Sequence, residues 1–237
     1  MAKAATPRPF IFVLAGVNGA GKSSVGGALL AEHGLAWYNP DSYARELVAL
    51  MGLSIGEANA RAWEHGRRQL EAAMAQGRNF AFETTLGAHT IPELLAQAAR
   101  THDVVMLFCG LASVDLHMRR VKERVAVGGH DIPEAKIRER WGASRLNLVR
   151  LLPHLARLQV FDNSVQAPSG KPIPDPVLLL ETLRGHVTHP GPKDREALNA
   201  TPEWARPIVQ AAFEYQAELL GTTPVKPPAA PRRKMLQ

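Results

Sequence analysis

The residues best suited to chemistry lie in one short stretch near the amino terminus, Gly16-Val-Asn-Gly-Ala-Gly-Lys-Ser-Ser24. This stretch fits the phosphate-loop pattern G-x-x-x-x-G-K-S/T at every fixed position, and it follows an apolar run of strand length, Phe10 to Ala15. Glycine permits the positive φ angles that turn successive backbone N–H groups toward an anion. In such loops the lysine reaches the β- and γ-phosphates, and the hydroxyl after it ligates Mg²⁺. We therefore predict a nucleoside triphosphate site, with Mg²⁺ on Ser23, formed by Gly16, Asn18, Gly19, Ala20, Gly21, Lys22, Ser23 and Ser24.

Acidic and hydroxyl side chains occur where two further predicted strands end. The segment 35–39 runs into Asp41, and the segment 79–82 runs into Glu83 and Thr85. Open α/β folds bind ligands at the carboxyl ends of their parallel strands, so we expect these side chains to face the phosphate loop. Asp41 could accept a hydroxyl proton during phosphoryl transfer, or it could merely cap the next helix. Glu83 could bind sugar hydroxyls, hold Mg²⁺ through water, or belong to a helix-capping cluster.

Arginines gather in a predicted lid. A helical pattern over 113–127 is interrupted at 128–133 by two glycines and a proline, and it resumes to residue 152. Between residues 119 and 150 there are nine Lys/Arg and four Asp/Glu, although the net charge of the whole chain is only +6. Arg120 and Arg124 are four residues apart and therefore share one helix face. We expect residues 119–145 to close over a nucleotide, and the alternative is a solvated basic face.

The remaining pattern indicates the fold that positions these residues. Strands are expected at 10–15, 35–39, 79–82, 103–109 and 157–161, with helices after the phosphate loop and over 55–76, 91–100 and 202–220. This is an α/β chain with the P-loop NTPase or kinase fold: a mostly parallel five-stranded sheet flanked by helices, with a helical lid and a C-terminal helix. The strand 103–109 ends without the acid of a Walker B motif, which favours a kinase over a motor ATPase. Asp162-Asn-Ser164 could line an adenine pocket or form an unaided turn, and residues 171–183 read as a loop before an edge strand or a helix.

Length and composition are consistent with one α/β domain and its appendages. The chain has 237 residues, 46% of them hydrophobic, and its single cysteine, Cys109, is expected to be a buried thiol. No apolar run reaches membrane-spanning length and the start lacks a secretory pattern, so we expect a cytoplasmic protein. The predicted parts are a flexible start at 1–9, a kinase domain at 10–188, an appended helix at 189–221 and a disordered basic tail at 222–237.

These motifs, in this order and spacing, resemble the zeta-toxin family of small-molecule kinases, in particular its shorter bacterial members, over about residues 10–164. The resemblance rests on the phosphate loop, Asn39-Pro-Asp41, Phe82-Glu-Thr-Thr-Leu86, Arg120-Val-Lys-Glu-Arg-Val-x-x-Gly-Gly-His130, Ile137-Arg-x-Arg-Trp141 and Asp162-Asn-Ser164. It implies an ATP-dependent kinase, using Mg²⁺, that phosphorylates a hydroxyl of UDP-N-acetylglucosamine, often as a toxin with an antitoxin partner.

The resemblance also implies roles for individual residues. Asp41 maps onto the catalytic base of the family, and Glu83 and Thr85 map onto its substrate-binding pair, with Thr84 where the family has glycine. Arg124 and Arg138 are expected to contact phosphates, and Arg120 is expected to stack on adenine. The alternatives are a kinase for another acceptor, such as a polynucleotide end, an antibiotic or another sugar, and a nucleotide-binding interaction protein without turnover.

Overall fold

A computed structural model describes residues 7–32, 35–129, 131–165 and 174–222. Residues 1–6 of the predicted flexible start, His130 of the lid motif, residues 171–173 and residues 223–237 of the predicted basic tail lie outside the described residues.

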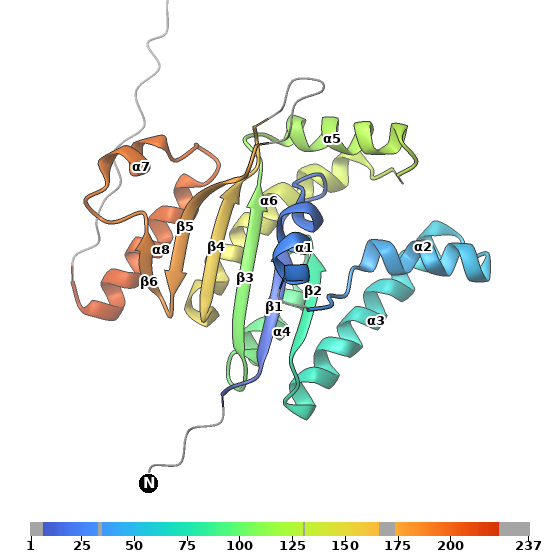
Figure 1. Cartoon of the computed structure of the whole chain (residues 1–237), viewed down its shortest axis with the longest axis horizontal. Helices are drawn as coiled ribbons and strands as arrows, with labels where there is room; N and C mark the ends of the chain where they lie inside the picture. The colour runs from blue at the N-terminus through green and yellow to red at the C-terminus, as the bar shows by residue number, and fades with distance from the viewer. Residues whose placement is uncertain (1–6, 33–34, 130, 166–173, 223–237) are drawn as a thin grey trace, which may run out of the picture.

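Six strands form one mixed sheet in the order β2-β1-β3-β4-β5-β6, which Figure 1 shows from right to left. The strands are β1 (Phe10–Ala15), β2 (Phe80–Thr84), β3 (Asp103–Gly110), β4 (Arg157–Asp162), β5 (Val177–Leu183) and β6 (His186–His189). The first four are parallel, and β5 and β6 are antiparallel to their neighbours. The predicted α/β fold is therefore confirmed, although the sheet has one strand more than expected and is mixed.

The prediction of a strand at 35–39 is wrong. Within this segment only Tyr38 pairs with the sheet, through an isolated parallel bridge to Phe82 of β2. Tyr38 N donates to Ala81 O at 2.8 Å and Tyr38 O accepts from Glu83 N at 2.9 Å. The chain then leaves the sheet because Pro40 has no N–H to continue a ladder and is well suited to begin a helix. The single bridge nevertheless places the residues after Tyr38 beside the end of β2.

Strands β5 and β6 form an antiparallel pair at the other edge of the sheet. This pair decides between the strand and the helix that the sequence analysis left open for residues 171–183. Strand β5 is joined to β6 by Arg184 and Gly185, whose φ angles are 47° and 81°. Two successive residues with positive φ are the mark of the tight turn that suits the right-handed twist of a hairpin. Of the two alternatives, strand or helix, the strand is present as β5, but it is not at the edge, because β6, which the sequence analysis did not predict, pairs outside it.

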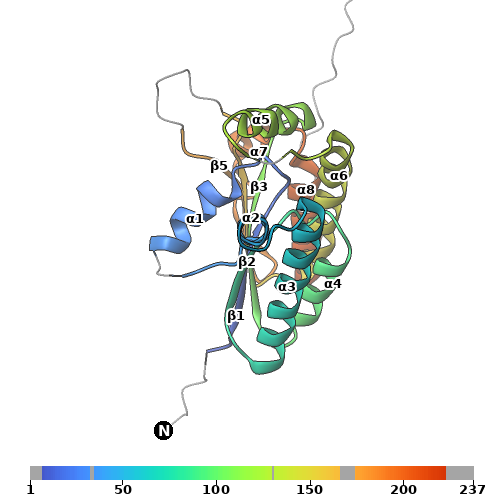
Figure 2. The same cartoon turned by 90° about the vertical axis from the view of Figure 1, so that its right-hand side faces the viewer.

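The helices cover the two faces of the sheet unequally. They are α1 (Lys22–Glu32), α2 (Pro40–Met51), α3 (Ile55–Gln76), α4 (Thr90–Ala98), α5 (Val114–Ala126), α6 (Glu134–Leu151), α7 (Arg195–Ala200) and α8 (Arg206–Leu220). In Figure 2, α3, α4, α6 and α8 lie on one side of the sheet and α1 lies on the other. The largest core, which includes Phe108, Leu148 and Phe213, fills the space beneath the four helices. None of the described helices is both long and apolar enough to cross a membrane.

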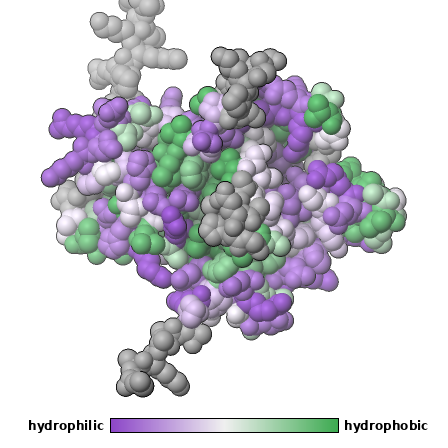
Figure 3. Space-filling view, in the orientation of Figure 1, coloured by the Kyte–Doolittle hydropathy of each residue, from purple (hydrophilic) through white to green (hydrophobic). Residues whose placement is uncertain are grey.

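Helices α2 and α3 form an arm at the side of the sheet (Figure 1). Their contact is made by small side chains, among them Ala44, Ala58 and Ala62. Leu50, near the end of α2, is 83% exposed. This end of α2 forms the apolar patch at the right edge of Figure 3. Helix α3 has the predicted bounds. The apolar residues at helical spacing that predict it as a packing helix include Trp63, but this side chain is 45% exposed.

The helix, glycine break and helix expected over 113–152 are confirmed. Ser113 caps α5 by accepting from Leu116 N at 3.2 Å, and Gly128, with φ of 96°, follows the end of that helix. At the carboxyl end of the chain, α8 begins at Arg206 rather than at 202, and α7 precedes it unpredicted. Helix α5 lies across the carboxyl ends of the parallel strands, at the top of Figure 1, and α6 runs from there along the sheet face that it shares with α3, α4 and α8.

Candidate active site

The phosphate loop connects β1 directly to α1, as predicted. Gly16, Gly19 and Gly21 have φ angles of 137°, 81° and 82°, a region that strains any residue with a side chain. A Cβ atom on Gly16 would lie 2.2 Å from the carbonyl oxygen of Cys109 on β3. Glycine at 16 is thus required by both the backbone conformation and the close approach of the neighbouring strand.

Buried side chains hold the carbonyl groups of the loop. His117 on α5, 1% exposed, lies with Nδ1 2.8 Å from Asn18 O, and Asn163 Nδ2 donates to Ala20 O at 2.9 Å. Burial lowers the pKa of His117 to about 4, so the imidazole is neutral near pH 7 and Nδ1 carries the proton that Asn18 O accepts. These contacts show what Asn163 does in the structure, since the loop 162–164 braces the phosphate loop.

The N–H groups of the loop remain available for an anion. Among the described residues, the backbone N–H groups of Gly19, Gly21 and Lys22 have no protein acceptor. Lys22 is also the first residue of α1, so the positive end of the helix dipole faces the same place. This arrangement fits a polyphosphate, as the sequence predicted.

Glu83 lies at the centre of the site. Its carboxylate accepts from Ser23 Oγ at 2.8 Å and from Asn39 Nδ2 at 3.0 Å, and Oε1 lies 3.4 Å from Lys22 Nζ. The side chains of Lys22 and Glu83 are 7% and 10% exposed. Glu83 therefore contacts the two phosphate-loop residues expected to serve the nucleotide and its metal, and it is not part of a helix cap. Carboxylate and hydroxyl oxygens are the ligands that Mg²⁺ accepts, so Ser23 and Glu83 fit a Mg²⁺ site.

Asp41 does not cap α2, which removes the alternative role considered for it. The N-cap is Asn39, whose Oδ1 accepts from Asp41 N at 2.9 Å and from Ser42 N at 3.1 Å. Asp41 occupies the first turn of the helix, and its side chain forms no hydrogen bond or ion pair with the described residues. Its carboxylate is therefore available to a ligand.

Two cavities meet at these residues. One, of about 740 Å³, is bordered by the phosphate loop and includes Gly19, Ser23, Arg120 and Arg124 in its lining. The other, of about 280 Å³, extends between α3 and α6 and includes Trp63 in its lining. The two cavities have six lining residues in common: Asn18, Lys22, Tyr38, Asn39, Asp41 and Glu83. We call them the loop-side cavity and the arm-side cavity.

Two arginines of the predicted lid, Arg120 and Arg124, line the loop-side cavity. Arg124 lines the loop-side cavity, and its Nε and Nη2 atoms are buried without a hydrogen-bond partner among the described residues. A guanidinium in that condition fits an anionic ligand that is held beside it. Arg120 lines the same cavity and donates from Nη2 to Val165 O at 3.3 Å.

Arg138 is the predicted lid arginine that the structure does not bring to either cavity. Its Nη2 lies 3.7 Å from Asp115 Oδ1, and its side chain is 55% exposed. Arg140, which the sequence analysis did not single out, lines the arm-side cavity and donates from Nη1 to Asn18 Oδ1 at 2.7 Å. A signal for it was present, because Arg140 shares a helix face with the buried Ile137 three residues earlier.

The arm-side cavity has a wall of its own from α3. Asn59, Trp63 and Arg67 are spaced by four residues and lie on one face of that helix. Thr85 lines the same cavity, as predicted. Thr84, which stands where the resembled family has glycine, accepts from Leu86 N at 3.1 Å and so stabilises the turn after β2, where Leu86 has a φ of 55°.

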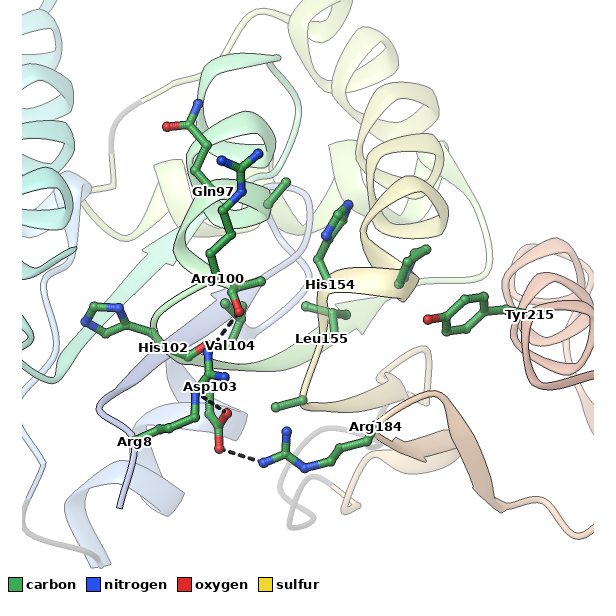
Figure 4. A pocket seen from close by; sticks show the side chains of 14 residues that line it. Arg8, Gln97, Arg100, His102, Asp103, Val104, His154, Leu155, Arg184 and Tyr215 are labelled. Atoms are coloured by element: carbon green, nitrogen blue, oxygen red, sulfur yellow. Dashed lines mark hydrogen bonds and ion pairs between the residues drawn. The ribbon is translucent and has the colours of Figure 1, made fainter. Parts of the chain in front are cut away.

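A third cavity, of about 430 Å³, lies at the opposite end of the parallel strands, where β3 and β4 begin. Figure 4 shows Asp103 between Arg8 and Arg184, with the Tyr215 hydroxyl pointing inward and the His102 ring on the far side. Arg184 Nη2 lies 2.9 Å from Asp103 Oδ2, and Arg8 Nε lies 3.4 Å from Asp103 Oδ1. These contacts tie the segment before β1 to the hairpin turn, and none of the predicted site residues lies there.

Solved structures with a similar fold include two of the AvrRxo1-ORF1:AvrRxo1-ORF2 complex. The one with ATP has a TM-score of 0.60 and 16% identity, over 87% of this chain and 64% of that one. The one with sulphate ions has a TM-score of 0.58 and 17% identity, over 76% of this chain and 60% of that one. This protein thus spans less than two thirds of the length of those chains.

A further similar structure comes from the PezAT chromosomal toxin-antitoxin system of Streptococcus pneumoniae. Its TM-score is 0.53 at 15% identity, and the match covers 92% of this chain and 90% of that one. At these identities the likeness establishes the fold. No curated protein matches this chain in sequence.

The family of the chain is established by its sequence. The model of the AAA domain family AAA_33 matches residues 11–142, which is more than half of the 237 residues. The matched part runs from β1 through the phosphate loop and Glu83 into α6, and it therefore contains both cavities' shared residues. The chain belongs to the AAA_33 family of AAA domains.

Proposed function

We propose that this protein is an ATP-dependent phosphotransferase that moves the γ-phosphoryl group to a hydroxyl of a small acceptor. The observation that carries the proposal is the shared wall of the two cavities, where Lys22, Glu83 and Asp41 serve both. A donor and an acceptor bound on either side of this wall would meet at a basic residue and a free carboxylate. The likeness to a fold solved with ATP supports the choice of donor.

On the donor side, the loop N–H groups and Lys22 bind the phosphates. Ser23 and Glu83 would hold Mg²⁺, which neutralises charge on the β- and γ-phosphates of such donors. Arg124, with its unpartnered guanidinium, contacts the γ-phosphoryl group, and Arg120 lies beside the loop 162–165 where the base would stack. Fixed donors of this kind stabilise charge in the transition state without reorganising.

On the acceptor side, Asp41 orients the hydroxyl and receives its proton. The acceptor oxygen forms a bond to the γ-phosphorus while the bond from that phosphorus to the β,γ-bridging oxygen breaks, and ADP leaves. Arg140 is placed by Asn18 at the arm-side cavity, where its charge would face the transferring group. We assign to Arg140 the lid contact that the sequence pattern had suggested for Arg138.

For the acceptor we propose UDP-N-acetylglucosamine, because Glu83 and Thr85 match the substrate-binding pair of the resembled zeta-toxin family. Thr85 lines the arm-side cavity beside Asn59 and Trp63, which offer hydrogen bonds and a stacking surface for a sugar ring. We also propose an antitoxin-like protein partner, since similar folds occur in a toxin-antitoxin system and in a two-protein complex. We further propose a cytoplasmic location, where ATP and nucleotide sugars are available.

The test is a transfer assay with ATP labelled at the γ-phosphate. The full chain is incubated with UDP-N-acetylglucosamine and separately with free sugars and a single-stranded oligonucleotide, and Asp41→Asn serves as the inactive control. Label on the nucleotide sugar supports the whole proposal, and label on another acceptor corrects the acceptor alone. If ATP binds but is neither hydrolysed nor used for transfer, the protein is a nucleotide-binding protein and the enzymatic assignment is overturned.

A further inference from the structure

We infer that Asn39 is a positioning residue that ties the base Asp41 to the phosphate loop through Glu83. The inference rests on the proposed function, in which Asp41 serves the acceptor and the loop serves the donor. Asn39 lines both cavities, but its amide is already bonded to Glu83 and to Asp41 N, so we expect its effect on the reaction to be exerted through these two neighbours.

The amide of Asn39 is used at both ends. Nδ2 donates to Glu83 Oε2 at 3.0 Å, and Oδ1 accepts from Asp41 N at 2.9 Å. A carboxylate can only accept and a backbone N–H can only donate, so one orientation of the amide satisfies both. The side chain therefore spans from the end of β2 to the first turn of α2.

Glu83 continues this connection into the phosphate loop. Its Oε2 atom is shared by Asn39 and Ser23 Oγ, and its Oε1 atom lies 3.4 Å from Lys22 Nζ. The carboxylate is 10% exposed, so hydrogen bonds and ion pairs to it are little weakened by water. A displacement of Asn39 would accordingly change the positions of the Ser23 and Lys22 side chains through Glu83.

Capping alone would not require asparagine. Serine, aspartate and threonine accept from the N–H groups of a first turn about as well, and the chain uses Ser54 and Ser113 to cap α3 and α5. Those residues cannot donate an amide N–H to Glu83 while accepting from the helix. The asparagine at 39 is thus explained by the connection and not by the cap.

Backbone contacts set α2 only approximately. The bridge between Tyr38 and β2 fixes the chain one residue before Asn39, whereas α2 itself packs on α3 and not on the sheet. The side-chain connection is therefore the contact that fixes the distance between Asp41 and the loop. Phosphoryl transfer is sensitive to such placement, since a shift of about 1 Å in a reacting group can cost roughly 10²-fold in rate.

The test compares variants that keep the cap but lose the connection. Asn39→Ser keeps a capping oxygen without the donor, and Asn39→Asp places a second carboxylate beside Glu83. For Asn39→Ser we expect a melting temperature within about 3 °C of wild type and an affinity for ATP within about threefold. For both variants we expect kcat for transfer to the acceptor to be lower by about tenfold or more. Ser54→Ala is the matched control: it loses a cap on α3, away from both cavities, and should lower the melting temperature with kcat unchanged.

A second measurement reads the connection without turnover. In a double-mutant cycle on the midpoint of urea unfolding, Asn39→Ser and Glu83→Ala should be clearly non-additive, because each variant removes one partner of the same hydrogen bond. Additive midpoints, or an Asn39→Ser enzyme with wild-type kcat, would overturn the inference and leave Asn39 a cap. If the wild type binds ATP but transfers no phosphoryl group, the proposed function fails, and the cycle still decides whether Asn39 is coupled to Glu83.

Discussion

Lys22 Nζ lies 3.4 Å from Glu83 Oε1, and the two side chains are 7% and 10% exposed. A buried pair of this kind is held in a fixed geometry, since neither charge can turn to water. The phosphate-loop lysine is thus oriented before a ligand arrives, by an acid from the neighbouring strand. Removal of either partner leaves the other charge buried.

Replacing Lys22 by Gln should weaken ATP binding by roughly 10- to 100-fold, because the neutral amide keeps a donor but loses the charge that faces the phosphates. Isothermal titration with ATP measures the change. Lys122→Gln, an exposed lysine of α5 paired with Glu134, is the matched control and should bind ATP as wild type does. Unchanged affinity in Lys22→Gln would contradict the phosphate-loop role.

The variant Asp41→Asn should lose about 10² to 10⁴ in kcat while its ATP affinity stays within about threefold, since a general base acts only in the chemical step. The fold should persist because Asn39, and not Asp41, caps α2. Single-turnover transfer of labelled phosphate measures the rate. Asp115→Asn, in the first turn of α5, controls for the loss of a negative charge at a helix start, and equal rates for the two variants would mean that the base is another group.

Among the lid arginines, Arg124→Ala and Arg140→Ala should each lower kcat by about 10²-fold, and Arg138→Ala should lower it by less than about threefold. The reason is their placement: the first two line the cavities and Arg138 pairs with Asp115 in solvent. Steady-state kinetics at saturating ATP tests this ranking. A loss in Arg138→Ala as large as in Arg124→Ala would show that the lid turns before transfer.

The buried His117 should make stability depend on pH. Burial lowers its pKa from the ordinary 6.5 to about 4, so between these values the unfolded chain binds a proton that the folded protein does not. The free energy of unfolding therefore falls as the pH drops through this window. Each pH unit below 6.5 corresponds to about 1.4 kcal/mol, so the contribution lost between about pH 7 and about pH 5 is roughly 2 kcal/mol.

Urea unfolding of wild type and His117→Asn at the two pH values isolates this effect. The asparagine amide can still donate to Asn18 O but does not titrate, so the variant should lose about 2 kcal/mol less stability on acidification than wild type does. His154→Asn, which changes an exposed histidine, should leave the pH dependence as it is. An identical pH dependence in wild type and His117→Asn would show that His117 is protonated in the folded protein.

The fold and the nucleotide side of the site were largely predictable from sequence, since their signals are local. The phosphate loop is contiguous, its residue types dictate its backbone, and the apolar strands around it are read from their own composition. The acceptor side was less predictable: the strand at 35–39 did not form because Pro40 begins α2, and Trp63 faces a cavity and not the core. Both errors concern how an arm packs beside the sheet.

The sequence by itself determined the α/β class, the loop from Gly16 to Ser24 and the position of Glu83 and Thr85 after a parallel strand, because the ends of parallel strands share one edge. Asp41 reaches the same edge although no strand leads to it, through the single bridge at Tyr38. Only the tertiary structure decided that Glu83 contacts Ser23 and Lys22, and that Arg140 lies at the cavity while Arg138 does not. Residues two apart on a helix point about 200° apart, so the rotation of α6 against the sheet chooses between them. That rotation is set by packing of residues distant in sequence, which no local pattern records.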